Sequence, residues 1–410
     1  MKHNPESGRK VLSAPVLLAF AIAFVPLIGL ATLQHVLPVF APLLMQAADM
    51  PPQAYGWVGG AVGLGAVWLY MANSAFTVAL GPVRALRVAA LVGIAGAVLV
   101  LSGEFVLILA GAVLIGFGYA TTTPAGSQIL ADHTPREHRG TLFSLRQAGV
   151  PIGGVIAGAG AGGLVAGLGW RVAFAVVVAV AVALCAMLLM APRRFNESRP
   201  LRPFRLSGLF AVANLLQPFR TVAATPGMAR IAGACVGFAV VQGATNAFFV
   251  TYMTAGLGLS LAFAGALFAS MQIASVAGRV VLGFVADWAG SPRPVLKALA
   301  LLSSLSSLLI ASMSGEWSTL QLFAAAVFVG LSIATWNGLY LAEAANMAPD
   351  AVSEATAATT FFVFATYMVT PPLAGIVIGY FGYRAVFVLA AIAALSSVVV
   401  LSPRRRDAAA

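Results

Sequence analysis

The chain carries little charge. Asp, Glu, Lys and Arg together make up 9% of its 410 residues, whereas soluble proteins carry about 25%. Hydrophobic residues make up 60%, which excludes an ordinary soluble domain and predicts an integral membrane protein. Only two cysteines occur, Cys185 and Cys235, and both fall inside apolar stretches. A disulfide framework is therefore not implied, and both are expected to be packing residues.

The sequence also lacks recognisable catalytic motifs. It contains no Gly-rich phosphate loop ending in Gly-Lys-Ser/Thr, no cluster of metal ligands and no nucleophile pattern. These absences argue against an enzyme, a cofactor or metal, and ATP hydrolysis within the chain. A net charge of +11 in a soluble domain would suggest nucleic acid. Here the basic residues flank apolar runs, which is the pattern that orients membrane proteins.

Long apolar runs are what the sequence does contain. A membrane-spanning helix needs about 20 predominantly apolar residues, and this rule predicts twelve spans with a basic connector after the sixth. We expect an N-terminal half at 1–190, a cytoplasmic connector at 191–228 and a C-terminal half at 229–410. The predicted spans are 15–46, 56–80, 86–102, 105–130, 140–166, 172–190, 229–256, 261–288, 294–312, 318–344, 351–381 and 384–401.

The distribution of basic residues predicts the orientation. Of the 23 Lys and Arg residues, nineteen fall on one side of the predicted spans, and only Arg171 and Arg384 fall on the other. The positive-inside rule then places both termini and the connector in the cytoplasm of a multi-pass protein of the bacterial inner membrane. Within the connector, Leu206 to Val222 is amphipathic, so it either lies along the inner membrane surface or is a disordered tether.

The two halves repeat each other. Gly-Trp-Arg-Val-Ala-Phe at 169–174 echoes Gly-Tyr-Arg-Ala-Val-Phe at 382–387. Other matching features, such as Glu104 with Glu316 and Pro135 with Pro349, have similar offsets, near half the chain length. Such a repeat predicts an all-α fold with two pseudo-symmetric six-helix halves and a solute site between them near the bilayer midplane.

Two polar stretches between apolar helices carry a family resemblance. The first covers the end of the eighth span and the turn after it, and contains Gly283, Asp287, Gly290 and Arg293. It resembles the loop signature of the major facilitator superfamily of membrane transporters. The second runs from Asp132 through Arg139 to Gly140 and leads into Arg-Gln-Ala-Gly-Val-Pro-Ile-Gly-Gly at 146–154. It resembles the cytoplasmic turn and the fifth helix of the same family, near the cyanate and organic-anion permeases.

The resemblance implies a twelve-helix transporter whose cytoplasmic gate uses these loop residues: Gly283, Asp287, Gly290, Arg293, Asp132 and Arg139. By the family's symmetry, Asp287 should lie near the start of the fifth helix, around 139–143. The first-half copy of the signature keeps Gly81 and Arg84 but has Val78 where the acid should stand. We therefore expect a weaker gate contact in that half. In the fourth helix, Ala112 replaces an arginine typical of proton-driven drug exporters.

Charges inside the predicted spans are few and positive. All twelve acids fall in tails, loops or helix ends, whereas Arg146, Arg279 and His35 lie within spans. Intramembrane ionisable residues are candidates for function, and two cations without a carboxylate suit an anion. Arg279 either binds substrate, or it extends to the cytoplasmic face or hydrogen-bonds backbone carbonyls. Arg146 either completes the anion site or pairs with Asp287.

Further expectations follow for individual side chains. The segment around Arg279 resembles the eighth-helix arginine of monocarboxylate and oxalate carriers, which implies that it binds a carboxylate. His35 either carries the coupled proton or is a polar helix-end residue that faces the external vestibule. Amides and aromatics in spans bind solute about as often as they hold helices together. The candidates carried forward for substrate binding are Arg279, Arg146, Gln147, Tyr119, Gln242, Asn246 and Asn337.

Three functions remain open. The first is a secondary transporter, a permease or symporter that moves a small organic anion by alternating access, as a monomer coupled to protons. The second is an exporter of hydrophobic or multidrug compounds, which the glycine-proline pattern of the fifth span motivates. The third is a membrane receptor that keeps the fold without transporting.

Overall fold

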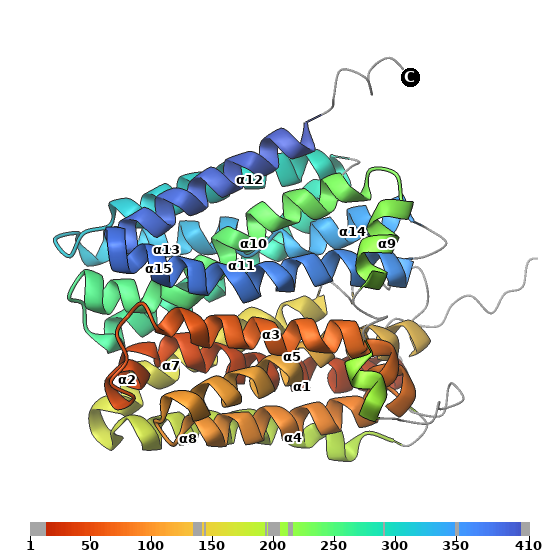
Figure 1. Ribbon diagram of the computed structural model, residues 1–410, viewed down its shortest axis with the longest axis horizontal. Coiled ribbons are helices and arrows are strands. Elements are labelled where there is room, and N and C mark those ends of the chain that lie inside the picture. Colours follow the sequence, from red (N-terminus) through yellow and green to blue (C-terminus); the bar gives the residue numbers. More distant parts are fainter. Residues whose placement is uncertain are drawn as a thin grey trace, which may run out of the picture.

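The computed structural model describes residues 14–133, 142, 145–192, 195, 206–211, 216–289, 292–348 and 352–402, and every regular element within these ranges is helical. Figure 1 shows long helices running in similar directions in two groups. The first part of the chain, red to yellow-green, forms the lower group, and the later part, green to blue, forms the upper group. The predicted all-α membrane fold is confirmed.

The lower group is built mainly from long helices joined by tight turns, with a π-helical turn, η1, that extends α3. Its described elements are α1 (Ala14–Val39), α2 (Ala41–Ala47), α3 (Tyr55–Asn73), η1 (Ser74–Val78), α4 (Pro82–Val100), α5 (Phe105–His133), α7 (Gly149–Leu168) and α8 (Trp170–Ala186).

The upper group has the same character, with a second π-helical turn, η7, after its first helix. Its described elements are α10 (Met228–Thr251), η7 (Tyr252–Gly256), α11 (Leu261–Trp288), α12 (Pro292–Ser312), α13 (Thr319–Ile333), α14 (Asn337–Met347) and α15 (Val352–Leu401). Along the chain, between the two groups, come the short helices η3 (Met187–Met190), η5 (Leu206–Phe210) and α9 (Gln217–Ala224).

The described helices are consistent with twelve membrane crossings. Ten segments are long and apolar enough to span a bilayer. The last of them contains Gly382 with φ 78° and ψ 174°, where α15 folds back on itself, so this segment supplies two crossings. Helix α3 adds another 19 helical residues. Gly169, the counterpart of Gly382 in the repeat, has φ 73° and ψ 162°. A positive φ at the same point of both halves requires glycine.

The two halves of the helix bundle approach each other closely toward one of its ends. We call the end with α9 the connector end and the opposite end, with α2, the far end (Figure 1). In the far half of α3, a Cβ at Gly56 would lie 2.3 Å from the backbone oxygen of Pro371, and one at Gly63 would lie 2.4 Å from the backbone of Met368. Glycine is what permits this contact between α3 and α15.

Glycines also permit close contact between α7 and α11. A Cβ at Gly158 of α7 would lie 2.8 Å from the backbone oxygen of Gly265 on α11, and one at Gly154 would meet the side chain of Gln272 at 2.2 Å. The backbones of the two halves are therefore in contact toward the far end of the bundle. We infer from these contacts that the far end is closed in this conformation.

The connector is anchored to both halves. Trp68 of α3 donates its indole N–H to the backbone oxygen of Leu209 at 3.0 Å and packs on Phe210. Phe219 of α9 packs on Phe361 and Phe362 of α15. The predicted amphipathic stretch 206–222 thus contains two short helices whose aromatic side chains contact the bundle while Phe210 stays 68% and Phe219 51% exposed. Residues 212–215 within it lie outside the described ranges.

Candidate functional site

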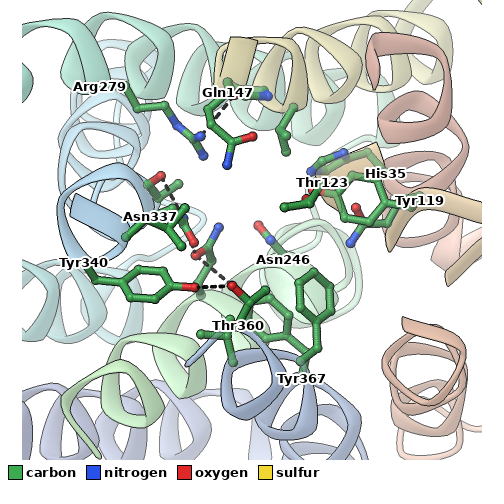
Figure 2. Close-up of a pocket in the computed structure, with 18 of the residues that line it drawn as sticks. His35, Tyr119, Thr123, Gln147, Asn246, Arg279, Asn337, Tyr340, Thr360 and Tyr367 are labelled. Carbon is green, nitrogen blue, oxygen red and sulfur yellow. Dashed lines mark hydrogen bonds between the residues drawn. The ribbon is translucent and has the colours of Figure 1, made fainter. Parts of the chain in front are cut away.

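A cavity lies between the two halves of the bundle. Its empty volume is about 760 Å³, including space open to solvent, which falls within the roughly 300–1,000 Å³ of small-molecule sites. Side chains of α1, α3, α5 and α7 line it from one half, and those of α10, α11, α14 and α15 line it from the other. Figure 2 shows Arg279 and Gln147 on one wall, with Tyr340, Thr360 and Tyr367 across from them.

An irregular backbone segment helps to shape the cavity. The chain leaves α13 at Ile333 and resumes as α14 at Asn337, and Ala334 and Asn337 line the cavity. Non-helical backbone at membrane depth is tolerated where it lines such a cavity or is buried in protein. Trp336, fully buried in the break, stacks on Phe238 with ring centroids 5.2 Å apart. This packing holds the break in place.

Arg279 projects into the cavity from α11. Its Nη1 donates a hydrogen bond to the backbone oxygen of Gln147 at 3.0 Å, whereas its buried Nε has no hydrogen-bond partner among the described residues. No Asp or Glu of the described chain lines the cavity. A buried cation without a counter-ion is costly, and an anion would supply the acceptor oxygens that the guanidinium lacks.

Gln242 organises the polar side chains of the second half. Its Oε1 accepts hydrogen bonds from the indole N–H of Trp336 at 3.0 Å, from Asn337 Nδ2 at 3.3 Å and from the Tyr367 hydroxyl at 2.8 Å. Three donors at one end identify it as the carbonyl oxygen. The amide NH₂ group of Gln242 is therefore left to donate, and Gln242 itself lines the cavity.

The first half contributes both polar and titratable groups. Gln34 of α1 lines the cavity, and its buried Oε1 has no partner in the described structure. His35, 4% exposed, also lines the cavity, with Nδ1 2.8 Å from the backbone oxygen of Ala31. Because a carbonyl only accepts, Nδ1 carries the proton, and Nε2 of the neutral ring is an acceptor. Tyr119 of α5 and Asn246 of α10 complete the predicted residues that line the cavity.

Arg146 does not line this cavity. The side chain is 2% exposed and packs toward α5, where Nη1 donates to the backbone oxygen of Thr122 at 3.0 Å and Nη2 approaches Ser127 Oγ at 3.4 Å. Of the two arginines predicted inside spans, the structure brings Arg279 to the solute space and gives Arg146 a backbone partner within its own half.

The predicted gate residues are only partly described. Asp132 lies in the last turn of α5, and Gly283 and Asp287 lie on the last turns of α11. Arg139 and Gly290 fall outside the described residues. The predicted contact of Asp287 with residues 139–143 therefore stays a prediction.

Arg293, the last of the loop residues, pairs with an acid that the sequence analysis did not connect to it. At the start of α12 it forms a salt bridge with Glu343 of α14. The Glu343 side chain is 7% exposed and that of Arg293 is 52% exposed. Sequence reasoning grouped Glu343 with the acids at helix ends, and nothing in its spacing identifies a partner 50 residues away.

Other lining residues were missed from sequence. Tyr340 and Thr360 both line the cavity, and their hydroxyl oxygens lie 2.9 Å apart. Gln272 and Tyr70 also line the cavity. One signal was available for Tyr340, because it follows Asn337 by three residues and side chains at that spacing share a helix face. The other three sit in apolar surroundings that do not distinguish a cavity from a packed interface.

Comparison with known proteins places the chain among transporters. The family model described as Major Facilitator Superfamily matches residues 16–365 and 232–410. No curated protein matched the chain in a separate sequence comparison.

Solved structures share the fold at low identity. A bacterial homologue of the human lysosomal transporter Spinster, in an inward-facing and unoccupied conformation, is 17% identical with a TM-score of 0.68, and 95% of each chain is covered. A mutant of the nucleoside transporter NupG is 15% identical with a TM-score of 0.69, covering 94% of this chain and 98% of that one. A POT family transporter in complex with a thioalcohol-conjugated peptide is 14% identical with a TM-score of 0.75, and 97% of each chain is covered.

Proposed function

Because this multi-pass membrane protein belongs to the Major Facilitator Superfamily, it is a secondary transporter that works by alternating access rather than an enzyme, and we propose that it moves a small organic anion. The observation that carries this proposal is Arg279. Its guanidinium lines the cavity between the halves, its Nε has no partner in the described structure, and no described acid lines the same space. A solute with a negative group meets these conditions, whereas a cation would add to the unbalanced charge.

The lining also favours a polar solute over a hydrophobic drug. Amide side chains of Gln34, Gln147, Gln242, Asn246 and Asn337 surround the cavity. An apolar compound would leave the free hydrogen-bonding atoms among them, such as Gln34 Oε1 and the NH₂ group of Gln242, without partners, which costs free energy for each one buried. We assign Arg279 to the anionic group of the solute and these amides, with Tyr119, to its orientation. Arg146, bonded within its own half, is proposed to support the site from behind.

Coupling to protons is part of the proposal. His35 is the one histidine among the described residues that line the cavity, and it is the natural proton carrier because imidazole titrates near neutral pH. Replacing His35 with Gln should abolish uptake driven by an inward proton gradient and leave substrate exchange intact. Loss of both activities would assign His35 to substrate binding instead.

The proposal also covers the orientation of the protein in the membrane, its oligomeric state and its gate. We propose that the connector end faces the cytoplasm of a bacterial inner membrane, as the excess of basic residues predicts, and that the protein acts as a monomer with halves at 1–190 and 229–410. The gate at that end would use Asp287 with the start of the fifth span. The closed far end then makes this an inward-facing conformation.

A binding screen tests the proposal. Purified full-length protein is heated with a library of small organic anions, their neutral amides and cationic drugs, and the melting temperature is recorded. Ligands that bind the folded state raise it. We expect anions alone to raise it, and Arg279→Gln to remove the effect. Arg171→Gln is the matched control, since Arg171 lies at the far end, bonded to the Leu101 backbone oxygen.

Other outcomes distinguish the alternatives. Shifts by hydrophobic drugs that persist in Arg279→Gln would favour the exporter. A ligand that binds but shows no flux in proteoliposomes would favour a receptor. Anions that shift wild type and Arg279→Gln equally would refute the assigned role of Arg279.

A further inference from the structure

The cavity carries an aromatic cluster in addition to its cation. Phe364 of α15 is its centre, with ring centroids 5.1 Å from Tyr70, 6.4 Å from Tyr119 and 5.4 Å from Tyr367. All four rings line the cavity, and they come from α3, α5 and α15, so both halves contribute. Figure 2 shows Tyr367 and Tyr119 away from Arg279, with the open space of the cavity between.

Two tyrosines of this cavity use their hydroxyl groups within the protein, whereas the buried Tyr70 hydroxyl has no hydrogen-bond partner among the described residues. The Tyr367 hydroxyl donates to Gln242 Oε1 at 2.8 Å, and the Tyr340 hydroxyl lies 2.9 Å from Thr360 Oγ1. With these hydroxyls engaged, what the two residues offer a solute is mainly their rings. A wall of ring faces and edges suits a flat, unsaturated group better than a polyhydroxylated chain, which needs free donors and acceptors along its length.

The charges limit the substrate further. Arg279 is the one Arg or Lys among the described residues that line the cavity, and no described acid lines it. One fixed positive charge balances one negative charge. A dicarboxylate would bring a second charge into a space without a second fixed cation, and an ammonium group would find no carboxylate to pair with.

Building on the proposed function, we propose that the substrate is a monocarboxylate that bears an aromatic ring. The carboxylate meets Arg279 beside Gln147, and the ring packs against the cluster centred on Phe364. Edge-to-face or offset contacts between rings contribute about 0.5–1.5 kcal/mol beyond the area they bury. That energy corresponds to an affinity ratio of about two- to tenfold over a saturated ring of the same size.

Matched probes separate charge from ring character. Binding of benzoate, cyclohexanecarboxylate, benzamide, terephthalate and gluconate to the purified full-length protein is measured by isothermal titration calorimetry. We expect benzoate to bind about two- to tenfold more tightly than cyclohexanecarboxylate. Benzamide and terephthalate should bind at least tenfold more weakly than benzoate, because one lacks the charge and the other carries a second.

A variant pair then tests the cluster itself. Phe364→Leu should remove the preference for benzoate over cyclohexanecarboxylate, while both anions still depend on Arg279. Phe362→Leu on the same helix is the control, because Phe362 packs on Phe219 of the connector and should leave the preference unchanged. If Phe364→Leu fails to fold, the comparison of benzoate with cyclohexanecarboxylate on the wild-type protein still tests whether the site prefers an aromatic ring.

The outcomes are separable from those of the proposed function. Equal affinities for benzoate and cyclohexanecarboxylate, or tighter binding of gluconate, would overturn the aromatic assignment even if every acid depends on Arg279. Binding of benzamide as tightly as benzoate would instead overturn the anion site itself.

Discussion

At the scale of the residue, the account depends on the chemistry of one guanidinium. Arg279 has a backbone partner on Nη1 and an unpartnered Nε, so its planar fork can offer parallel donors to a carboxylate. An ammonium keeps the charge but loses this geometry. We expect Arg279→Lys to weaken transport about tenfold, the equivalent of one charge-assisted hydrogen bond, with normal expression. Initial uptake rates across substrate concentrations measure it, and rates equal to wild type would mean that charge alone suffices.

The Arg293–Glu343 pair leads to a stability prediction. Both residues belong to the second half, at the start of α12 and on α14, so the pair need not break during alternating access. Glu343→Gln should lower the free energy of unfolding by about 1 kcal/mol, a modest loss because Arg293 is half exposed. The charge-reversed variant Arg293→Glu/Glu343→Arg should recover part of it. A double-mutant cycle on thermal stability checks this, and additive losses would show that the pair contributes nothing.

The sequence indicated how deep each arginine lies in its helix, but not which way its side chain points. Arg279 lies eight residues before Asp287 and Arg146 lies seven after Arg139, which puts both roughly 10–12 Å inside their helices. The structure turns Arg279 toward the cavity and Arg146 toward α5. The sequence around Arg146 mixes apolar, small and polar residues, among them Ser144 and Gln147, so no periodicity indicates which side meets the solute.

At the scale of the element, glycines let α3 and α15 approach closely toward the far end of the bundle. Gly63 of α3 has no room for a side chain, because its Cβ would lie 2.4 Å from the Met368 backbone on α15. Gly63→Trp should hold the far end open. Labelling of Asn246→Cys, inside the cavity, by an impermeant maleimide from the far side should then rise several-fold.

Gly163→Trp is the control for this substitution, since a Cβ at Gly163 on α7 meets nothing within 4 Å. It should leave labelling at position 246 as it is in the parent protein. Equal labelling of the Gly63→Trp and Gly163→Trp proteins would show that the α3–α15 contact does not govern closure of the far end.

The positions of the helices could be predicted from the sequence better than the interruptions within them. Span lengths and the glycines of the repeat are local properties, and the helices follow them closely. The interruption between α13 and α14 was not expected, because 318–344 reads as one apolar run. It depends on Trp336 stacking against Phe238 of another helix, a tertiary contact that no local pattern contains.

At the scale of the whole molecule, low charge, the repeat and the loop motifs together predicted the fold class and the family. The cavity itself was not readable from the sequence. Its lining comes from helices of both halves, and it includes Tyr340, Thr360 and Phe364, which lie in apolar runs. Which of many similar side chains meet there depends on how the two halves dock.

The central claim is that a solute anion binds Arg279 in the cavity between the halves, and flux tests it most directly. Uptake of labelled benzoate and labelled acetate into proteoliposomes is measured for wild type, Arg279→Gln and Arg171→Gln at matched reconstitution. The account predicts saturable uptake of at least one anion by wild type and Arg171→Gln, and uptake at the level of empty liposomes for Arg279→Gln. Uptake by Arg279→Gln with unaltered affinity would contradict it and make Arg279 a structural residue.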